Sequence, residues 1–172
     1  MGHESHERKK HIMRELEAVV RKQDDGELRW FAGGGVHRWL ATRDETAGSF
    51  LLFEDSIEGG KATPLHSHPT AESLYVLEGS IVLHMDGVDH PLGVGSFATA
   101  PAGVPHAFMV TSDSAKLLFL HTPGPAECEA FYRQASTPLA STRDIDFSVV
   151  RAAAEQTGGM TLIGPPPFAA PS

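Results

Sequence analysis

Residues 60–79 have the sequence GKATPLHSHPTAESLYVLEG, in which two histidines and a glutamate lie between apolar runs. His66 and His68 are two positions apart, so on an extended strand both side chains project from the same face. The Pro-Thr pair that follows predicts a turn, after which Glu72 begins the next strand and points into the same space. Three possible metal ligands therefore converge, although a His-x-His pair alone is more often polar surface than a site.

A second turn, GSFATAPAGVPH at residues 95–106, supplies a fourth candidate ligand. His106 follows prolines and a glycine that set a turn at the start of another predicted strand. Three imidazoles and a carboxylate suit a divalent transition ion, and they leave open positions on a five- or six-coordinate ion. The sequence therefore predicts a metal centre of His66, His68, Glu72 and His106, for Fe, Mn, Ni, Cu, Co or Zn. Four solvated surface side chains are the competing interpretation.

The region from about Leu28 to Thr122 has the pattern of an all-β domain. Short apolar or alternating runs recur there, separated by Gly, Pro and Asp. Nine candidate strands follow: LRWFA, VHRWLAT, SFLLFED, SLYVLE, SIVLHMDG, VDHPLG, SFATAP, HAFMVT and AKLLFLHT. The Asp-Gly pair of MDGVD predicts a tight hairpin. Many short strands with frequent turns favour a closed or two-layered β structure.

The segments on either side of this region have helical patterns. Residues 1–27 are highly charged and predict a short amphipathic helix behind a frayed end, with its apolar positions at Ile12, Leu16, Val19 and Val20. After the β region, AECEAFYRQAS and RDIDFSVVRAAAEQTGG predict helices, the second capped by Asp144 and ended by Gly158. A proline-rich tail follows.

Length and composition limit the organisation and the partners. A chain of 172 residues suits one domain, here an extension at 1–27, a β-barrel at 28–123 and a C-terminal segment at 124–172. The formal net charge of -8 disfavours nucleic acid as a partner. No apolar run is long enough for a membrane span and no leader is visible, so a cytoplasmic protein is expected. The one cysteine, Cys128, excludes an intramolecular disulfide and predicts a small buried or half-exposed thiol.

The two candidate site halves resemble the two motifs of the cupin superfamily, with 15 residues between them. The matching positions are Gly60, His66, His68, Glu72 and Gly79, then Gly95, Pro101, Gly103 and His106. Further blocks, among them SLYVLEGSIVLHMDG and IGPPPF, are similar to small single-domain bacterial cupins grouped with quercetin 2,3-dioxygenases. The resemblance covers roughly residues 32–168. It implies a cupin double-stranded β-helix, or jelly-roll, barrel with the metal inside and the N-terminal and C-terminal helices packed outside.

The resemblance also implies an activity. If the resemblance extends to activity, the flavonol would bind the metal through its 3-hydroxyl oxygen, and Glu72 would take that proton. Dioxygen would then attack the flavonol, and the central ring would open with release of carbon monoxide. A small aromatic or apolar substrate, dioxygen and a homodimer are therefore the expected partners, with Leu28–Thr42 as a strand that could meet the second copy. Two alternatives remain open: another metal-dependent enzyme, such as an isomerase or a different dioxygenase, and a non-catalytic cupin that binds metal or a small ligand.

One position departs from the family. The second motif commonly has an asparagine four residues after its histidine, and here that position is Val110. Alternation places Val110 on the face of His106 and Phe108, so the surroundings of the site become drier and suit an apolar substrate. The candidate pocket residues are Phe53, Val76, Phe108 and Val110. The four histidines that lie singly in strands or turns are expected to be half-exposed: His37, His84, His90 and His121.

Overall fold

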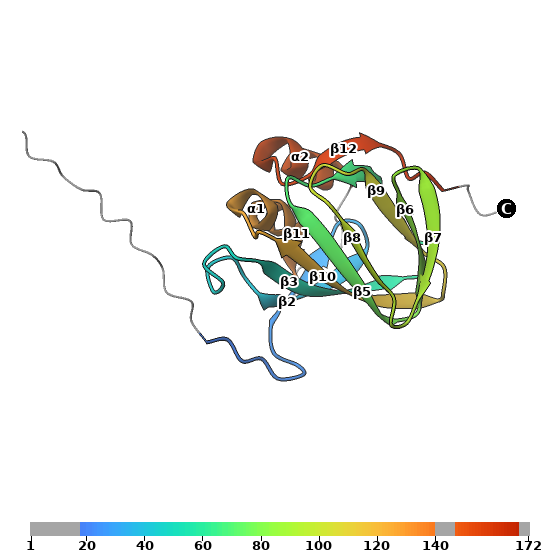
Figure 1. The fold of residues 1–172 in the computed structure, drawn as a ribbon. Helices are drawn as coiled ribbons and strands as arrows, with labels where there is room; N and C mark the ends of the chain where they lie inside the picture. Colours follow the sequence, from blue (N-terminus) through green and yellow to red (C-terminus); the bar gives the residue numbers. More distant parts are fainter. Residues whose placement is uncertain (1–17, 140–146, 169–172) are drawn as a thin grey trace, which may run out of the picture.

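The structure, a computed structural model, describes residues 18–139 and 147–168. Within these ranges the chain forms two antiparallel sheets with two helices outside them (Figure 1). The seven-stranded sheet has the order β11 (Ser136–Pro138), β1 (Glu27–Phe31), β2 (Gly35–Ala41), β3 (Leu51–Glu58), β10 (Ser114–Thr122), β5 (Ala71–Glu78) and β8 (Phe97–Ala100). The five-stranded sheet has the order β12 (Thr161–Gly164), β4 (Leu65–Ser67), β9 (His106–Val110), β6 (Ser80–Met85) and β7 (Val88–Gly93). The all-β jelly-roll prediction is confirmed.

The core lies between the two sheets and follows the two-residue period of the strands. In β3 the side chains of Leu51, Phe53, Asp55 and Ile57 are buried, while those between them are half-buried or exposed. Strand β10 shows the same alternation. Apolar side chains from both sheets form one contiguous cluster. The inward faces of both sheets also carry polar residues, and some of these form the site described below.

All nine predicted strands are present, with ends that differ from the predicted ones by at most three residues. The Asp-Gly hairpin prediction is also confirmed, because Asp86 and Gly87 both have positive φ angles, 52° and 77°, between β6 and β7. Three strands were not predicted. These are β4, which is only three residues long, and β11 and β12, which lie in the segment that was expected to be helical and extended.

The N-terminal helix prediction is not supported where it can be compared with the structure. Residues 18–26 contain no helix, and Val20 is 86% exposed rather than part of a buried helix face. The other apolar positions of that prediction, Ile12 and Leu16, lie outside the described residues. In the described part, the chain enters the sheet directly at β1.

The C-terminal segment provides both helices and also extends both sheets. Helices α1 (Ala126–Gln134) and α2 (Phe147–Thr157) pack beside each other at one end of the barrel (Figure 1). Strand β11 pairs with β1, and β12 pairs with β4, so the barrel does not end at residue 123. Helix α2 ends directly before Gly158, whose φ of 71° suits a helix terminus, whereas its predicted cap Asp144 lies outside the described residues. Neither helix is long and apolar enough to cross a membrane.

The strand expected at a dimer interface is fully paired within the chain. Strand β1 lies between β11 and β2, and β2 lies between β1 and β3. A second copy would therefore have to pack against a face of these strands or replace one of their partners. The homodimer stays a prediction.

Candidate metal centre

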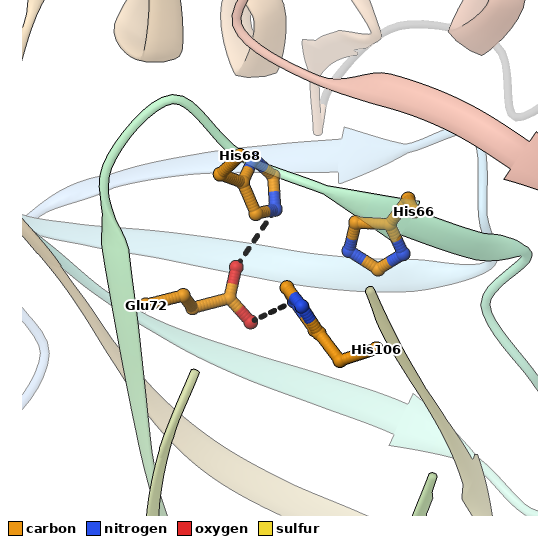
Figure 2. Close-up of side chains that lie close together, drawn as sticks. All are labelled: His66, His68, Glu72 and His106. Atoms are coloured by element: carbon orange, nitrogen blue, oxygen red, sulfur yellow. Dashed lines mark ion pairs between the residues drawn. The ribbon is translucent and has the colours of Figure 1, made fainter. Parts of the chain in front are cut away.

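Three strands and the residue after one of them bring the predicted ligands together inside the barrel. His66 lies in β4, His68 directly after it, Glu72 in β5 and His106 at the start of β9. Strands β4 and β9 pair with His66 opposite His106, and their ring centroids are 4.5 Å apart. Figure 2 shows the four side chains pointing toward a common centre. One ligand atom from each lies within 4.8 Å of the others, and all four residues are buried.

Backbone carbonyls fix the orientation of all three imidazoles. The Nδ1 atoms of His66, His68 and His106 lie 2.7, 2.8 and 2.9 Å from the carbonyl oxygens of Pro64, Gly159 and Val104. A carbonyl oxygen only accepts, so each Nδ1 carries the hydrogen and each Nε2 presents a lone pair. A hydrogen bond from Nδ1 to a backbone carbonyl is the usual arrangement for histidines that bind a metal through Nε2.

Glu72 lies between two of these histidines. Its Oε2 is 2.9 Å from Nε2 of His68, and its Oε1 is 3.5 Å from Nε2 of His106 (Figure 2). Burial raises the pKa of this carboxyl, but the charges and hydrogen bonds of His68 and His106 outweigh burial and hold the pKa well below its usual range. Glu72 is therefore an ionised acceptor.

His66 and His106 differ in their affinity for a proton. Burial, followed by repulsion from His68 and His106, lowers the pKa of His66 to about 3. Burial also lowers the pKa of His106, but the hydrogen bond and charge of Glu72 outweigh it, so the net pKa of His106 is raised. A metal ion needs the neutral form of both rings, so near neutral pH it can bind His66 directly, whereas at His106 it competes with a proton.

This difference predicts weaker metal binding in acid. A metal ion must displace the proton of His106, so lowering the pH below its raised pKa is expected to weaken affinity by up to about tenfold for each pH unit. Competition with a chromophoric chelator between pH 7.5 and pH 5 measures this slope. An affinity for the metal that is unchanged at pH 5 would count against the ligand set.

His121 is the site residue that the sequence interpretation missed. It was expected to be half-exposed, but it is completely buried, with Nε2 3.3 Å from Oε2 of Glu72 and 2.9 Å from the hydroxyl of Tyr132. Burial lowers its pKa to about 3 despite the opposing charge of Glu72, so the ring stays neutral. The signal was available, since His121 has the same two-residue phase as Phe119 in β10. His121 therefore contacts Oε2 of the Glu72 carboxylate, whereas His106 lies near Oε1.

The other single histidines vary in burial. His37 is 2% exposed, so the expectation of half-exposure is wrong for it as well. His84 is half-buried and its Nδ1 lies 2.6 Å from Oδ1 of Asp89, while His90 is exposed. Neither His84 nor His90 lies in the ligand cluster.

Cys128 is buried, and burial raises the pKa of its thiol to about 12, as expected of an inert thiol.

A cavity of about 60 Å³ opens beside the ligands, with His66 and Glu72 in its wall. Of the predicted pocket residues, Phe53 and Phe108 line it. Val76 and Val110 are buried in the core and do not line it. Much of the wall is aromatic, formed by Phe31, Phe53, Phe108, Phe119 and Tyr132.

The residues present fit a metal ion. Nε2 of His68 and of His106 is buried and has no hydrogen-bond partner among the described residues apart from its ion pair with Glu72. Three imidazole nitrogens and one carboxylate oxygen form a donor set suited to divalent transition ions. The cluster could therefore hold one such ion at the cavity wall, with an open side toward the cavity.

The chain is similar in sequence to known cupins. The cupin-domain family model matches residues 53–122, a range that contains all four candidate ligands. Quercetin 2,3-dioxygenase of Bacillus subtilis (strain 168) is 29% identical over 111 residues, which cover 64% of this chain. The match covers 32% of that protein, so the chain spans about a third of the length of its relative.

Solved structures share the fold. An RmlC-like cupin from Shewanella frigidimarina NCIMB 400 superposes with a TM-score of 0.58 at 19% identity, over 64% of this chain and 96% of that one. A predicted oxalate decarboxylase from Thermotoga maritima gives a TM-score of 0.55 at 23% identity, over 62% of this chain and 99% of that one.

Proposed function

Because the chain carries a cupin domain and resembles quercetin 2,3-dioxygenase in sequence, we propose that it is a metal-dependent dioxygenase of the quercetin 2,3-dioxygenase type. Its substrate would be a flavonol or a similar small molecule with an enolic hydroxyl next to a carbonyl, and dioxygen would be the second substrate. His66, His68, Glu72 and His106 would hold one divalent transition-metal ion, and Glu72 would also serve as the base.

The observation that carries the proposal is the orientation of the ligands at the cavity wall. The carbonyl contacts at Nδ1 leave all three Nε2 atoms as lone-pair donors, and His66 and Glu72 face the cavity. A molecule in the cavity could therefore reach both the ion and the carboxylate. A purely structural histidine cluster has no need of this opening.

Glu72 has the features of a proton acceptor. When bound, the ion would act as a Lewis acid that lowers the pKa of the substrate hydroxyl. Glu72 is ionised, and its Oε2 lies 3.3 Å from Nε2 of the neutral His121, a contact that involves none of the other metal ligands. The enolic proton would pass to a Glu72 carboxylate oxygen, leaving an electron-rich substrate for dioxygen to attack. The aromatic walls exclude water from this step.

The cavity volume favours a second candidate within the same chemistry. A cavity of about 60 Å³ is small beside the roughly 300–1,000 Å³ of typical ligand pockets, which favours one small ring over the three rings of a flavonol. A single-ring enol, such as a 3-hydroxy-4-pyranone, presents the same hydroxyl and carbonyl to the metal. The flavonol would have to extend through the mouth of the cavity, past Gly33 and Lys61.

The test is oxygen-dependent consumption of quercetin and, separately, of maltol by protein reconstituted with Fe, Mn, Ni, Co, Cu or Zn. We expect turnover with at least one metal, and release of one carbon monoxide per quercetin if the flavonol is the substrate. Metal-free protein and a nitrogen atmosphere are the controls. Stoichiometric metal binding without oxygen-dependent loss of either compound would reject the dioxygenase and leave another cupin enzyme or a binding protein.

A further inference from the structure

A second polar cluster lies in the same cavity, away from the candidate ligands. His37 in β2 and Asp55 in β3 are directly opposite each other in the sheet, and both line the cavity. Along the inward face, Asp55 is in register with Leu117, whereas Glu72 is in register with His121 four residues further along β10. The row that contains Phe53 and Phe119 separates the two clusters.

The His37–Asp55 pair is buried but only partly satisfied. The two residues are 2% and 6% exposed, and Nε2 of His37 lies 3.3 Å from Oδ2 of Asp55. Their other polar atoms, Nδ1 of His37 and Oδ1 of Asp55, are buried without a hydrogen-bond partner among the described residues. Buried polar atoms of this kind are costly, and in native proteins they are exceptions that call for a reason.

Gly35 and two phenylalanines pack around the pair, but they donate no hydrogen bond to its two unpartnered atoms. Gly35 lies opposite Ile57 and next to the Asp55 carboxylate, where a Cβ would overlap Oδ1. A larger residue would collide with that oxygen, which gives a structural reason for one glycine of the run GGG at residues 33–35. The His37 ring is held between two phenylalanines, stacked on Phe31 at 4.6 Å and tilted against Phe53 at 4.8 Å.

The chemistry of the free atoms defines the group they would recognise. The carboxylate at Nε2 favours the tautomer of His37 with its hydrogen on that nitrogen, so Nδ1 is an acceptor. Oδ1 of Asp55 is also an acceptor. Two acceptors in an aromatic cavity suit a ligand that donates a hydrogen bond, and a bond to a carboxylate is stronger than one between neutral groups.

We propose that His37 and Asp55 form a specificity subsite that binds a hydroxyl group on the far side of the substrate from its metal-binding edge. The inference rests on the proposed function, because it takes the enolic edge of the substrate to lie at the metal ligands. It adds a second requirement to that function: besides its enolic hydroxyl, the preferred substrate carries another hydroxyl on the far side of the molecule. Phe53 and Phe119, between the two clusters, would contact its ring.

Two pyranones that differ by one hydroxyl test the subsite. Kojic acid and allomaltol have the same 5-hydroxy-4-pyranone edge, and they carry hydroxymethyl and methyl groups, respectively, on the opposite side of the ring. Calorimetric titration of zinc-loaded protein is expected to show kojic acid binding about tenfold more tightly than allomaltol. The double substitution His37→Phe with Asp55→Leu should reduce the ratio of dissociation constants to about one. It removes both polar groups together, which avoids leaving one of them buried alone.

An exposed His–Asp pair provides the matched control. His84 and Asp89 face each other on β6 and β7, outside the cavity, so His84→Phe with Asp89→Leu should keep the tenfold ratio. Asp55→Asn, a milder change, should lower the ratio only partly. Equal binding of the two pyranones to the unaltered protein, binding of neither, or a ratio that survives the His37/Asp55 change would each overturn the subsite. Because zinc binding and affinity are measured without turnover, failure of the dioxygenase assay is a separate result.

Discussion

Glutamine in place of Glu72 is expected to lower turnover about a thousandfold while leaving most of the metal bound. General base catalysis typically contributes between about a hundredfold and ten-thousandfold, and the amide of glutamine is a far weaker proton acceptor than the carboxylate. The three imidazoles remain, each held by its backbone carbonyl, so the ion keeps most of its ligands. Steady-state rates at matched metal occupancy measure the effect.

Glu78→Gln is the matched control for this prediction. Glu78 ends the same strand as Glu72, but its side chain is exposed and pairs with Lys116 at 2.7 Å. Its substitution should change turnover little, since surface ion pairs contribute at most about 1 kcal/mol to stability. Full activity of the Glu72→Gln protein would remove Glu72 as the base, whatever its role as a ligand.

Removal of His106 is expected to lower metal affinity more than a hundredfold. Substituting a residue that only hydrogen-bonds to a metal ligand typically lowers metal affinity ten- to a hundredfold, and His106 would supply a donor atom directly. It is also the ligand from the second half of the site, on β9, opposite His66. Competition with a chelator measures the affinity of His106→Ala, and circular dichroism confirms that the barrel is folded.

His84→Ala is the corresponding control, because His84 is a strand histidine outside the ligand cluster. It should bind metal as the unaltered protein does. An affinity of His106→Ala within a few-fold of the unaltered protein would mean that the ion lies elsewhere or that His106 is not a ligand.

The sequence contained most of the information for the barrel and for the convergence of the four candidate ligands. The alternating apolar runs predicted nine strands, because a strand with one buried face has a two-residue period. Strands β11 and β12 escaped prediction because they are held by pairing with β1 and β4, which no local pattern encodes. Short β4 escaped for the same reason, since its partners lie in β9 and β12.

Two buried histidines of the cavity region were not predicted, because both were expected to be half-exposed. His37 shares the phase of Trp39 in β2, and His121 shares that of Phe119 in β10, so both belong on the inward face. Histidine was interpreted as a half-exposed residue by type, although its position in the alternation indicated the core. The contacts of His121 with Glu72, and the empty hydrogen-bonding positions of His37 and Asp55, could be found only from the three-dimensional arrangement.

Anomalous X-ray diffraction at the absorption edge of the reconstituted metal tests the metal centre most directly. We predict one peak per chain, within about 2.0–2.3 Å of Nε2 of His66, His68 and His106 and of a carboxylate oxygen of Glu72. Soaking at pH 5 should weaken that peak. A strong peak at another position, or none in crystals of protein that contains one metal per chain in solution, would contradict the ligand set on which the proposed function depends.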